Sequence, residues 1–206
     1  MSVLDLSPVV PVVVLTDHDH AVPLAHALLS GGIRTIEVTL RTDAALPAVE
    51  RIAAEVPDMV VGAGTVTSPG QVADAVGAGA QFLVSPGSTA TLLDAMAAAG
   101  LPFLPGVSTV SEVLSVLERG LTEMKFFPAE AAGGRAYLKA IAGPLPQVRF
   151  CPTGGITPRT APEYLELPNV GCVGGSWLAP ADALAAGDWT SVKQMATEAA
   201  ALGVRP

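Results

Sequence analysis

One lysine stands where a chemically active amine would be expected. The chain has three lysines, and only Lys125 lies in a segment with strand character, Glu123–Phe127; the other two fall on predicted helices. Alternation along a strand places Lys125 and Phe127 on one face and the apolar residues beside them on the other. An amine attacks a carbonyl only when it is uncharged, so desolvation or a nearby cation must disfavour the charged form. The pattern indicates a nucleophilic lysine; the alternative is a lysine at a strand edge whose amine reaches water or pairs with Glu130.

A second segment carries three polar side chains at alternate positions. Glu37, Thr39 and Arg41 share one face of the predicted strand Arg34–Leu40 and its end, and the residues between them are apolar. Such groups are costly inside a protein unless they are paired or functional. Arg41 can bind a substrate carboxylate through two hydrogen bonds, and Glu37, one layer deeper, can move a proton near a lysine. The alternative is an internal Glu37–Arg41 ion pair that only fills space.

Paired glycines close two further predicted strands. The sequence reads Thr-Gly-Gly at 153–155 and Gly-Gly-Ser at 174–176. Without side chains, the backbone N–H groups of such pairs can approach an anion closely, and the serine adds a hydroxyl donor. One such pair can be a plain tight turn, but two at successive strand ends predict a site for phosphate or an equivalent oxyanion.

Other candidate strand ends carry weaker signals. The segment Gly62–Thr65 allows close approach of a ligand and offers the Thr65 hydroxyl, although this threonine can instead cap the next helix. Ser85–Gly87 is typical of a rigid turn. Asp17–His20 contains metal-binding residue types, but neighbouring side chains point in different directions and no other strand end adds a histidine. We expect a solvated loop there, with Asp19 near a helix start, and no metal site.

The elements that must position these residues alternate regularly along the chain. Short apolar, β-branched segments alternate with helical segments rich in alanine and leucine, which is typical of βαβ units and a parallel sheet. The expected strands are Val9–Leu15, Arg34–Leu40, Met59–Val66, Phe82–Ser85, Phe103–Pro105, Glu123–Phe127, Arg149–Pro152 and Val170–Gly174. The expected helices are Ala21–Leu29, Ala44–Val56, Pro69–Val76, Thr89–Ala99, Val110–Glu118, Gly134–Ala142, Ala161–Leu167 and Asp188–Ala201. Helix ends are expected at glycines free to take a positive φ: Gly31-Gly32, Gly79, Gly100, Gly120 and Gly143.

The number of expected strands decides the architecture. Eight strands, each followed by a helix, predict an α/β fold of the single (β/α)8 TIM-barrel type, at the short end of its size range. The 206 residues leave no room for a second domain, so residues 1–206 are expected to form one domain. An open doubly wound sheet is the alternative, but no G-x-G-x-x-G follows the first strand. In a barrel, the strand-end residues described above would meet at one end.

Composition excludes several classes of function. With a net charge of −8 and 11 basic residues spread thinly, the chain has no cationic stripe for nucleic acid. The apolar segment Val9–Leu15 is far below the ~20 residues of a membrane span, and the N-terminus has no basic start. Cys151 and Cys172 are too few for a disulfide framework and lack zinc-ligand spacing. We therefore expect a protein of a reducing, cytoplasmic compartment with no nucleic-acid or membrane partner.

Taken together, the motifs resemble those of one known family, the 2-keto-3-deoxy-6-phosphogluconate (KDPG) aldolases, also described as 2-keto-4-hydroxyglutarate (KHG) aldolases. The similar segments are Glu37–Arg41 (EVTLR), Gly62–Thr65 (GAGT), Ser85–Gly87 (SPG), Lys125–Glu130 (KFFPAE), Pro152–Ile156 (PTGGI) and Gly174–Trp177 (GGSW). The resemblance runs from about Val9 to about Asp188, and no motif departs from the family pattern. It implies a class I aldolase of the Entner–Doudoroff pathway with a (β/α)8 fold, a homotrimer that needs no metal or other cofactor.

The resemblance also implies a role for each motif residue. Lys125 would form the Schiff base, and Glu37 would be the general acid/base. Arg41 and Thr65 would hold the pyruvyl carboxylate, and Pro86 and Phe127 would shape the pocket. The phosphate would be bound by the remaining strand-end residues, with Thr153 lining the same cavity as Gly154, Gly155, Gly175 and Ser176.

The expected reaction cleaves KDPG into pyruvate and glyceraldehyde 3-phosphate, with the imine at Lys125 as the electron sink. The same chemistry would split KHG into pyruvate and glyoxylate. The expected partners are thus a 2-keto acid and an aldehyde phosphate. Two rivals remain: a phosphate-binding barrel that isomerises or epimerises sugar phosphates, and a non-catalytic binder of a phosphorylated metabolite. Neither gives Lys125 a covalent role.

Overall fold

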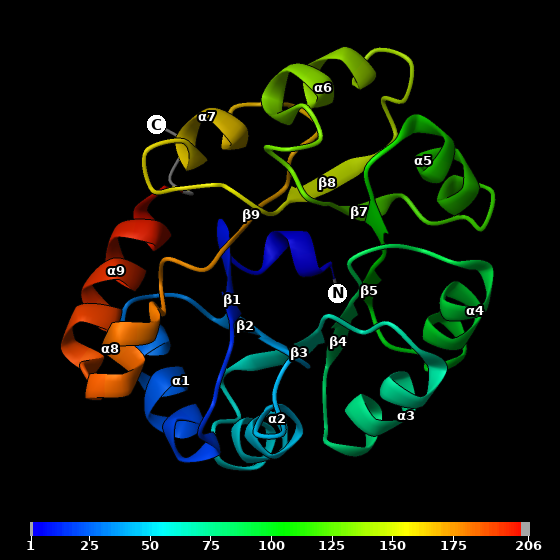
Figure 1. The fold of residues 1–206 in the computed structure, drawn as a ribbon. Coiled ribbons are helices and arrows are strands. Elements are labelled where there is room, and N and C mark those ends of the chain that lie inside the picture. Colours follow the sequence, from blue (N-terminus) through cyan, green and yellow to red (C-terminus); the bar gives the residue numbers. More distant parts are fainter. Residues whose placement is uncertain (1, 203–206) are drawn as a thin grey trace.

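The computed structural model describes residues 2–202, and it places parallel strands at the centre with helices around them (Figure 1). A six-stranded sheet has the order β5-β4-β3-β2-β1-β9, and a three-stranded sheet has the order β6-β7-β8. The strands are β1 (Val9–Val13), β2 (Thr35–Thr39), β3 (Val60–Gly64), β4 (Phe82–Val84), β5 (Phe103–Leu104), β6 (Gly106–Val107), β7 (Glu123–Phe126), β8 (Arg149–Pro152) and β9 (Val173–Gly175). The helices are α1 (Ala21–Ser30), α2 (Ala45–Glu55), α3 (Pro69–Gly77), α4 (Ala90–Ala98), α5 (Val110–Leu117), α6 (Gly134–Ile141), α7 (Ala161–Leu165), α8 (Ala181–Ala186) and α9 (Trp189–Ala201), with 3-10 helices η1 (Val3–Asp5) and η2 (His18–His20).

The parallel sheet is curled, and its two parts adjoin on both sides. On one side Pro105 alone separates β5 from β6 in the chain. On the other side two isolated parallel bridges, from Phe150 to Val170 and from Thr153 to Gly174, connect β8 with the segment of β9. The prediction of a parallel α/β fold with alternating strands and helices is therefore confirmed.

Several predicted elements need correction. The strand expected at Phe103–Pro105 is two short strands, because the proline has no N–H to continue the hydrogen-bonded ladder. The strand expected at Val170–Gly174 begins later and runs from Val173 to Gly175. The helix α8 and both 3-10 helices were not predicted; with six residues in α8 and three in each 3-10 helix, they are too short to show helical periodicity.

Helix boundaries follow local chemistry in most places. The helix α5 begins with a capping box, in which the Glu112 carboxylate accepts a hydrogen bond from the Thr109 N–H at 2.8 Å. Glycines of positive φ follow helices as predicted at Gly32, Gly79, Gly100 and Gly120.

Gly31 and Gly143 do not take the positive φ that was expected. At Gly31, where φ is −92°, a Cβ would lie 2.4 Å from the Cβ of Ala196. This glycine therefore permits close packing of α1 against α9, and the positive φ belongs to the next residue, Gly32.

The buried apolar residues form two layers. The larger layer lies between the strands and the helices, and the smaller one is Val3, Leu4, Val10, Phe82, Val84, Leu104, Cys151 and Cys172, whose strand members alternate with residues of the larger layer. Strand alternation explains this division, since neighbouring side chains point to opposite faces. None of the helices within residues 2–202 is long and apolar enough to cross a membrane.

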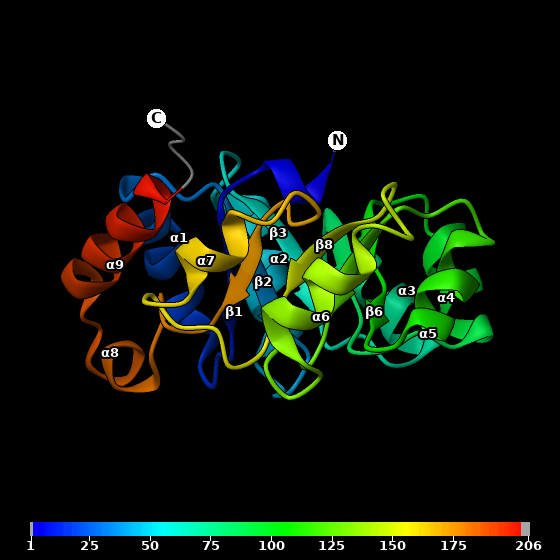
Figure 2. The ribbon, with the colours of Figure 1, turned by 90° about the horizontal axis from the view of Figure 1, so that it is seen from above.

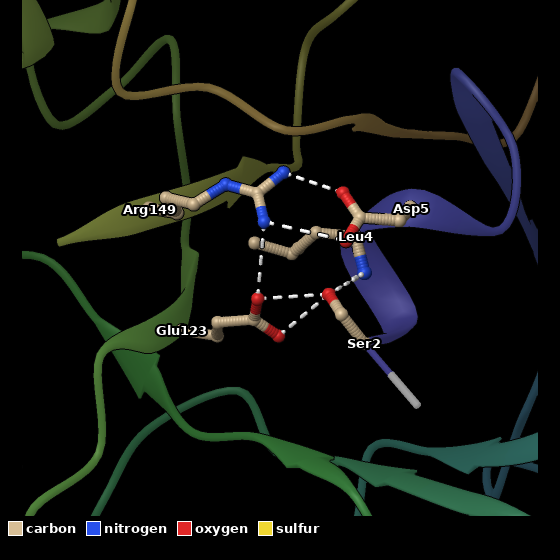
Figure 3. A network of polar contacts seen from close by, with 5 residues as sticks. All are labelled: Ser2, Leu4, Asp5, Glu123 and Arg149. Atoms are coloured by element: carbon tan, nitrogen blue, oxygen red, sulfur yellow. Dashed lines mark hydrogen bonds and ion pairs between the residues drawn. The ribbon is translucent and has the colours of Figure 1, made fainter.

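The N-terminal segment packs across one end of the curled sheet. The η1 side chains Val3 and Leu4 are each 1% exposed and belong to the smaller layer. Figure 2 shows η1 at the edge of the molecule, beside the strands. Two polar contacts fix it to β8 and β7, as Figure 3 shows: the Arg149 guanidinium meets the Asp5 carboxylate at 2.6 Å, and the Ser2 hydroxyl donates to the Glu123 carboxylate at 2.8 Å. Arg149 and Glu123 also pair with each other at 3.3 Å, which joins β8 to β7.

Candidate active site

A buried ion pair joins Lys125 on β7 to Glu37 on β2. The Lys125 Nζ and the Glu37 Oε1 lie 3.1 Å apart, and the two residues are only 5% and 3% exposed. The Lys125 Nζ also lies 5.4 Å from the centre of the Phe127 ring. Met124 and Phe126 point the other way, into the layer between strands and helices, as strand alternation predicted. The lysine therefore points into the interior of the curled sheet.

The side chains considered as alternative partners are engaged elsewhere. Glu130 accepts a hydrogen bond from the Tyr164 hydroxyl at 2.7 Å. The Arg41 Nε donates to the Thr65 hydroxyl at 3.4 Å. Within the described residues, then, Lys125 does not pair with Glu130 and Glu37 does not pair with Arg41.

Strand β3 leaves room for the Glu37 side chain. The strand register sets Glu37 beside Gly62 and Thr39 beside Gly64. A Cβ on Gly64 would lie 2.1 Å from the Glu37 Oε1, which is far inside van der Waals contact. Only a glycine at this position allows the carboxylate to reach Lys125. The GAGT segment thus provides the space that the Glu37 side chain needs, in addition to the side chain of Thr65.

The Lys125–Glu37 pair is suited to proton transfer and to nucleophilic attack. Two charges removed from water stabilise a fold poorly, because their desolvation offsets their attraction. Transfer of one proton along the hydrogen bond leaves an uncharged amine and a carboxylic acid, and the amine can then attack a carbonyl. A carboxylate within hydrogen-bond distance also meets the geometric requirement for a general acid/base.

Thr65 holds the one strained backbone conformation among the non-glycine residues that the structure describes. Its φ is +57°, a conformation that costs a residue other than glycine about 1–3 kcal/mol. The alternative role in helix capping is wrong, because Ser68 caps α3 by accepting from the Gln71 N–H. The strained conformation instead holds the Thr65 hydroxyl next to the exposed Arg41 guanidinium at the strand ends. With the Arg41 Nε–H donated to Thr65, the Nη–H groups of Arg41 and the Thr65 hydroxyl remain as donors suited to a carboxylate.

The turn at Ser85–Gly87 packs against the start of β6. The Ser85 side chain is fully buried, and its Oγ accepts from the Gly106 N–H at 3.2 Å. A Cβ on Gly106 would lie 2.3 Å from the Pro86 carbonyl carbon. Pro86 is consequently fixed beside the strand that pairs with Lys125, since the register aligns Gly106 with Lys125.

The two glycine pairs lie side by side, because the bridge from Thr153 to Gly174 connects them. Gly154 and Gly155 have φ of +104° and +81°, so the turn requires glycine at both positions. A Cβ on Gly174 would meet the Thr153 hydroxyl at 2.2 Å. Gly175, likewise, has no space for a Cβ because the Trp177 ring would lie 2.0 Å from it.

These contacts bring the predicted phosphate-binding residues together at the ends of β8 and β9. Ser176, directly after Gly175, is exposed. The Gly154 turn also reaches the lysine strand, since a Cβ there would be 3.4 Å from the Phe127 ring. The two parts of the predicted site are thus adjacent through Phe127.

The contacts of the Asp17–His20 segment are a helix cap and an ion pair with α2. Asp17 caps the short helix η2 by accepting from the Asp19 N–H at 2.9 Å, and Asp19 lies near a helix start as expected, two residues before α1. The Asp19 carboxylate pairs with Arg51 on α2 at 2.6 Å. In the part of the chain that the structure describes, no three His, Cys, Asp or Glu side chains are grouped so that they could hold a metal ion.

Sequence reasoning did not identify Gly106 or Tyr164, and it assigned Gly64 to the close approach of a ligand without predicting that this glycine makes room for Glu37. The roles of the two glycines depend on what a Cβ would meet across neighbouring strands. Tyr164 lies on a helix, in a pattern that predicts only core packing. The signal for Gly64 was present in the GAGT segment, where two glycines in one predicted strand indicate close approach of another group.

The fold and the site define the class of the protein: a parallel α/β enzyme in which a buried lysine, paired with a carboxylate, can form a Schiff base. This is the arrangement of the class I aldolases. Residues 1–195 match the family model described as "Aldolase: KDPG and KHG aldolase". The chain belongs to this family.

Similar proteins cover almost the whole chain. The KHG/KDPG aldolase of Escherichia coli (strain K12) is 56% identical over 198 residues, which are 96% of this chain and 93% of that protein. A KDPG aldolase structure from Legionella pneumophila, described with pyruvate captured at low pH as a covalent carbinolamine intermediate, is 49% identical and covers 96% of each chain with a TM-score of 0.94. The KDPG aldolase of Zymomonas mobilis ZM4, with 3-phosphoglycerate, is 48% identical and covers 97% of this chain and 93% of its own, with a TM-score of 0.91.

Proposed function

We propose that this protein is a class I aldolase that cleaves KDPG to pyruvate and glyceraldehyde 3-phosphate through a Schiff base at Lys125. The observation that carries the proposal is the buried contact of 3.1 Å between the Lys125 Nζ and the Glu37 carboxylate. Family membership supports it, as does the pyruvate carbinolamine described for the Legionella pneumophila relative.

The covalent steps use only these two side chains and water. The uncharged Lys125 amine attacks the C2 carbonyl, and loss of water gives a protonated imine. Glu37, directly or through one water, takes the proton of the C4 hydroxyl. The C3–C4 bond then breaks, its electron pair moves into the iminium to give a neutral enamine, and the aldehyde leaves. Protonation of the enamine at C3 and hydrolysis release pyruvate and the free lysine.

The remaining motif residues bind the two ends of the substrate. Arg41 and Thr65 hold the pyruvyl carboxylate, and their mutual hydrogen bond supports this role. Pro86 and Phe127 form the walls on either side of the lysine. Thr153, Gly154, Gly155, Gly175 and Ser176 receive the phosphate, a role supported by their adjacency at the strand ends.

We also propose the finer architecture that the family implies. The curled sheet closes into a single (β/α)8 barrel, the whole of residues 1–206 forms one domain, and three chains assemble into a homotrimer. The adjoining edges of the two sheets support closure. The substrates are small molecules, and two free, buried cysteines favour a reducing, cytoplasmic location. Analytical ultracentrifugation distinguishes a trimer from a monomer directly.

Trapping with pyruvate and borohydride tests the covalent step. We expect a stable adduct on the tryptic peptide that contains Lys125, and none in a Lys125→Met variant of unchanged circular dichroism. Lys139→Met, which removes an exposed lysine on α6, is the matched control and should keep the adduct. Turnover of a sugar phosphate without an adduct would favour an isomerase or epimerase, and binding without turnover or adduct would favour a non-catalytic binder.

Cleavage of KHG to pyruvate and glyoxylate is proposed as a second activity of the same site, because the family model names both substrates. The two reactions share every covalent step, and they differ in the leaving aldehyde. Comparison of kcat/KM for the two substrates measures how much the phosphate end contributes.

A further inference from the structure

A pair of side chains outside the substrate-contacting set, Glu130 and Tyr164, lies against the glycine turn that follows β8. The segment after β7 is hydrogen bonded to this turn: the Ala129 N–H donates to the Thr153 carbonyl at 2.8 Å, and the Glu130 N–H donates to the Gly154 carbonyl at 3.1 Å. Carbonyl and following N–H point in opposite directions across a planar trans peptide. The Glu130 contact therefore turns the Gly155 N–H away from Glu130.

The Glu130 side chain also packs directly onto the turn. A Cβ on Gly155 would lie 2.7 Å from the Glu130 Cγ and 2.8 Å from its Cβ. Since Gly155 has a φ of +81°, the turn is held in a conformation that its sequence alone does not favour over others. The backbone hydrogen bond of Glu130 and the packing of its side chain therefore restrict the same turn.

Tyr164 on α7 fixes the position of the Glu130 carboxylate. Its side chain is fully buried, and its hydroxyl donates to the Glu130 Oε1 at 2.7 Å. Burial, together with this carboxylate, raises the pKa of the Tyr164 hydroxyl, so the hydroxyl stays protonated as a donor at neutral pH. Gly134 leaves the space for the contact, since a Cβ there would be 3.0 Å from the Tyr164 hydroxyl oxygen.

We propose that Glu130 and Tyr164 are positioning residues that hold the Gly154–Gly155 turn in its phosphate-binding conformation, without contact to the pyruvate end of the site. This inference rests on the proposed function and assigns a task to two residues that make none of the contacts of the covalent steps. This pair of residues, here called the brace, acts only on the phosphate end of the substrate. A KHG molecule, whose second carboxylate is attached next to the cleaved bond, ends short of this turn.

Kinetics with the two substrates test the brace. Tyr164→Phe removes the donor and leaves the ring, and Glu130→Ala removes the acceptor, which lies on an exposed residue. We expect either variant to raise KM for KDPG by about tenfold, the effect of losing one hydrogen bond to a charged group, with kcat changed less. The kcat/KM for KHG and the rate of borohydride trapping with pyruvate should stay at the wild-type values.

Two control variants separate the brace from general damage. Glu130→Gln keeps an oxygen that can accept from Tyr164, so it should restore a KM for KDPG close to that of the wild type. Tyr137→Phe removes the hydroxyl of the only other tyrosine, which has no hydrogen-bond partner within the described residues, and should leave all constants unchanged.

Several outcomes would overturn the inference. Equal losses on KDPG and KHG would show that the pair supports the whole site, and unchanged constants in both variants would show that it supports nothing in the site. Calorimetric titration with inorganic phosphate gives a separate test: both variants should bind it about tenfold more weakly than the wild type. A wild-type protein that binds phosphate but cleaves neither substrate would refute the proposed aldolase activity, and phosphate titration of the variants would then decide on the brace. A wild-type protein that binds no phosphate would refute the brace.

Discussion

At the scale of single residues, the site depends on one carboxylate that reaches one amine. Lys125 and Glu37 come from strands 88 positions apart in the chain, and both are almost completely buried. A buried pair of this kind contributes little net stability, because desolvation offsets the attraction between the charges. Its presence is better explained by chemistry than by folding, and that distinction can be measured.

Glu37→Gln separates the two explanations. The amide keeps the size of the side chain and an oxygen that can accept from Lys125, but it cannot take up a proton. We expect kcat for KDPG cleavage to fall by about 10²–10⁴-fold, the usual contribution of a general acid/base. The urea midpoint should also fall, because the substitution leaves the buried Lys125 without its charged partner, so kcat is the measurement that decides. A variant with kcat within about threefold of the wild type would show that Glu37 is structural.

Gly64→Ala tests the clearance that Glu37 needs. The added Cβ would lie 2.1 Å from the Glu37 Oε1, so the carboxylate must move away from Lys125. We expect a loss of kcat at least comparable to that of Glu37→Gln. Gly77→Ala at the end of α3 is the control, because nothing lies within 4 Å of its Cβ, and it should leave kcat at the wild-type value. Wild-type kcat in Gly64→Ala would show that the Glu37 position seen here is not required.

At the scale of elements, sequence patterns predicted the strands and the main helices but not the packing of η1 across one end of the curled sheet. Alternation and helical periodicity are properties of a segment itself, so Glu123–Phe126 and Arg149–Pro152 could be found from their residues alone. The element η1 has three residues and no periodicity, and its stability comes from β7 and β8, which are far away in the chain.

The same reason explains what could be predicted of the site. Lys125, Glu37 and the glycine pairs were identifiable because polar residues or paired glycines in a strand conflict with a plain core. The contact between Lys125 and Glu37, and the brace of Glu130 and Tyr164, depend on which strands become neighbours and in which register. No single segment of the sequence contains that information.

The contribution of η1 can be measured with Leu4→Ala. The Leu4 side chain is 1% exposed within the smaller apolar layer, and its removal leaves a cavity. We expect a loss of about 2–5 kcal/mol in the free energy of unfolding, measured by urea denaturation. Leu114→Ala on α5, where leucine is 45% exposed, should cost far less and serves as the control. Equal effects would indicate that η1 is not part of the cooperative core.

At the scale of the whole molecule, the proposed closure of the barrel depends on the contact between β8 and the segment of β9, here called the seam. Between β8 and the segment of β9 the sheet has only two isolated bridges, whereas β2 and β3 align five residue pairs. Cys151 and Cys172 lie along this seam, at 3% and 0% exposure, and both are free thiols. They therefore report on whether the seam opens by itself.

Thiol labelling at increasing urea concentration tests the seam. The neighbouring Cys151 thiol and burial raise the pKa of Cys172, so its reactive thiolate is scarce in the folded protein. If the ring is closed, both cysteines should react only through global unfolding, and the labelling rate should rise with urea as steeply as global unfolding does. Rapid labelling with little dependence on urea would instead show that β8 and β9 separate while the rest stays folded. The sheet would then be curled but open, and the substrate-binding turns at the ends of these two strands would have to be held together by other contacts.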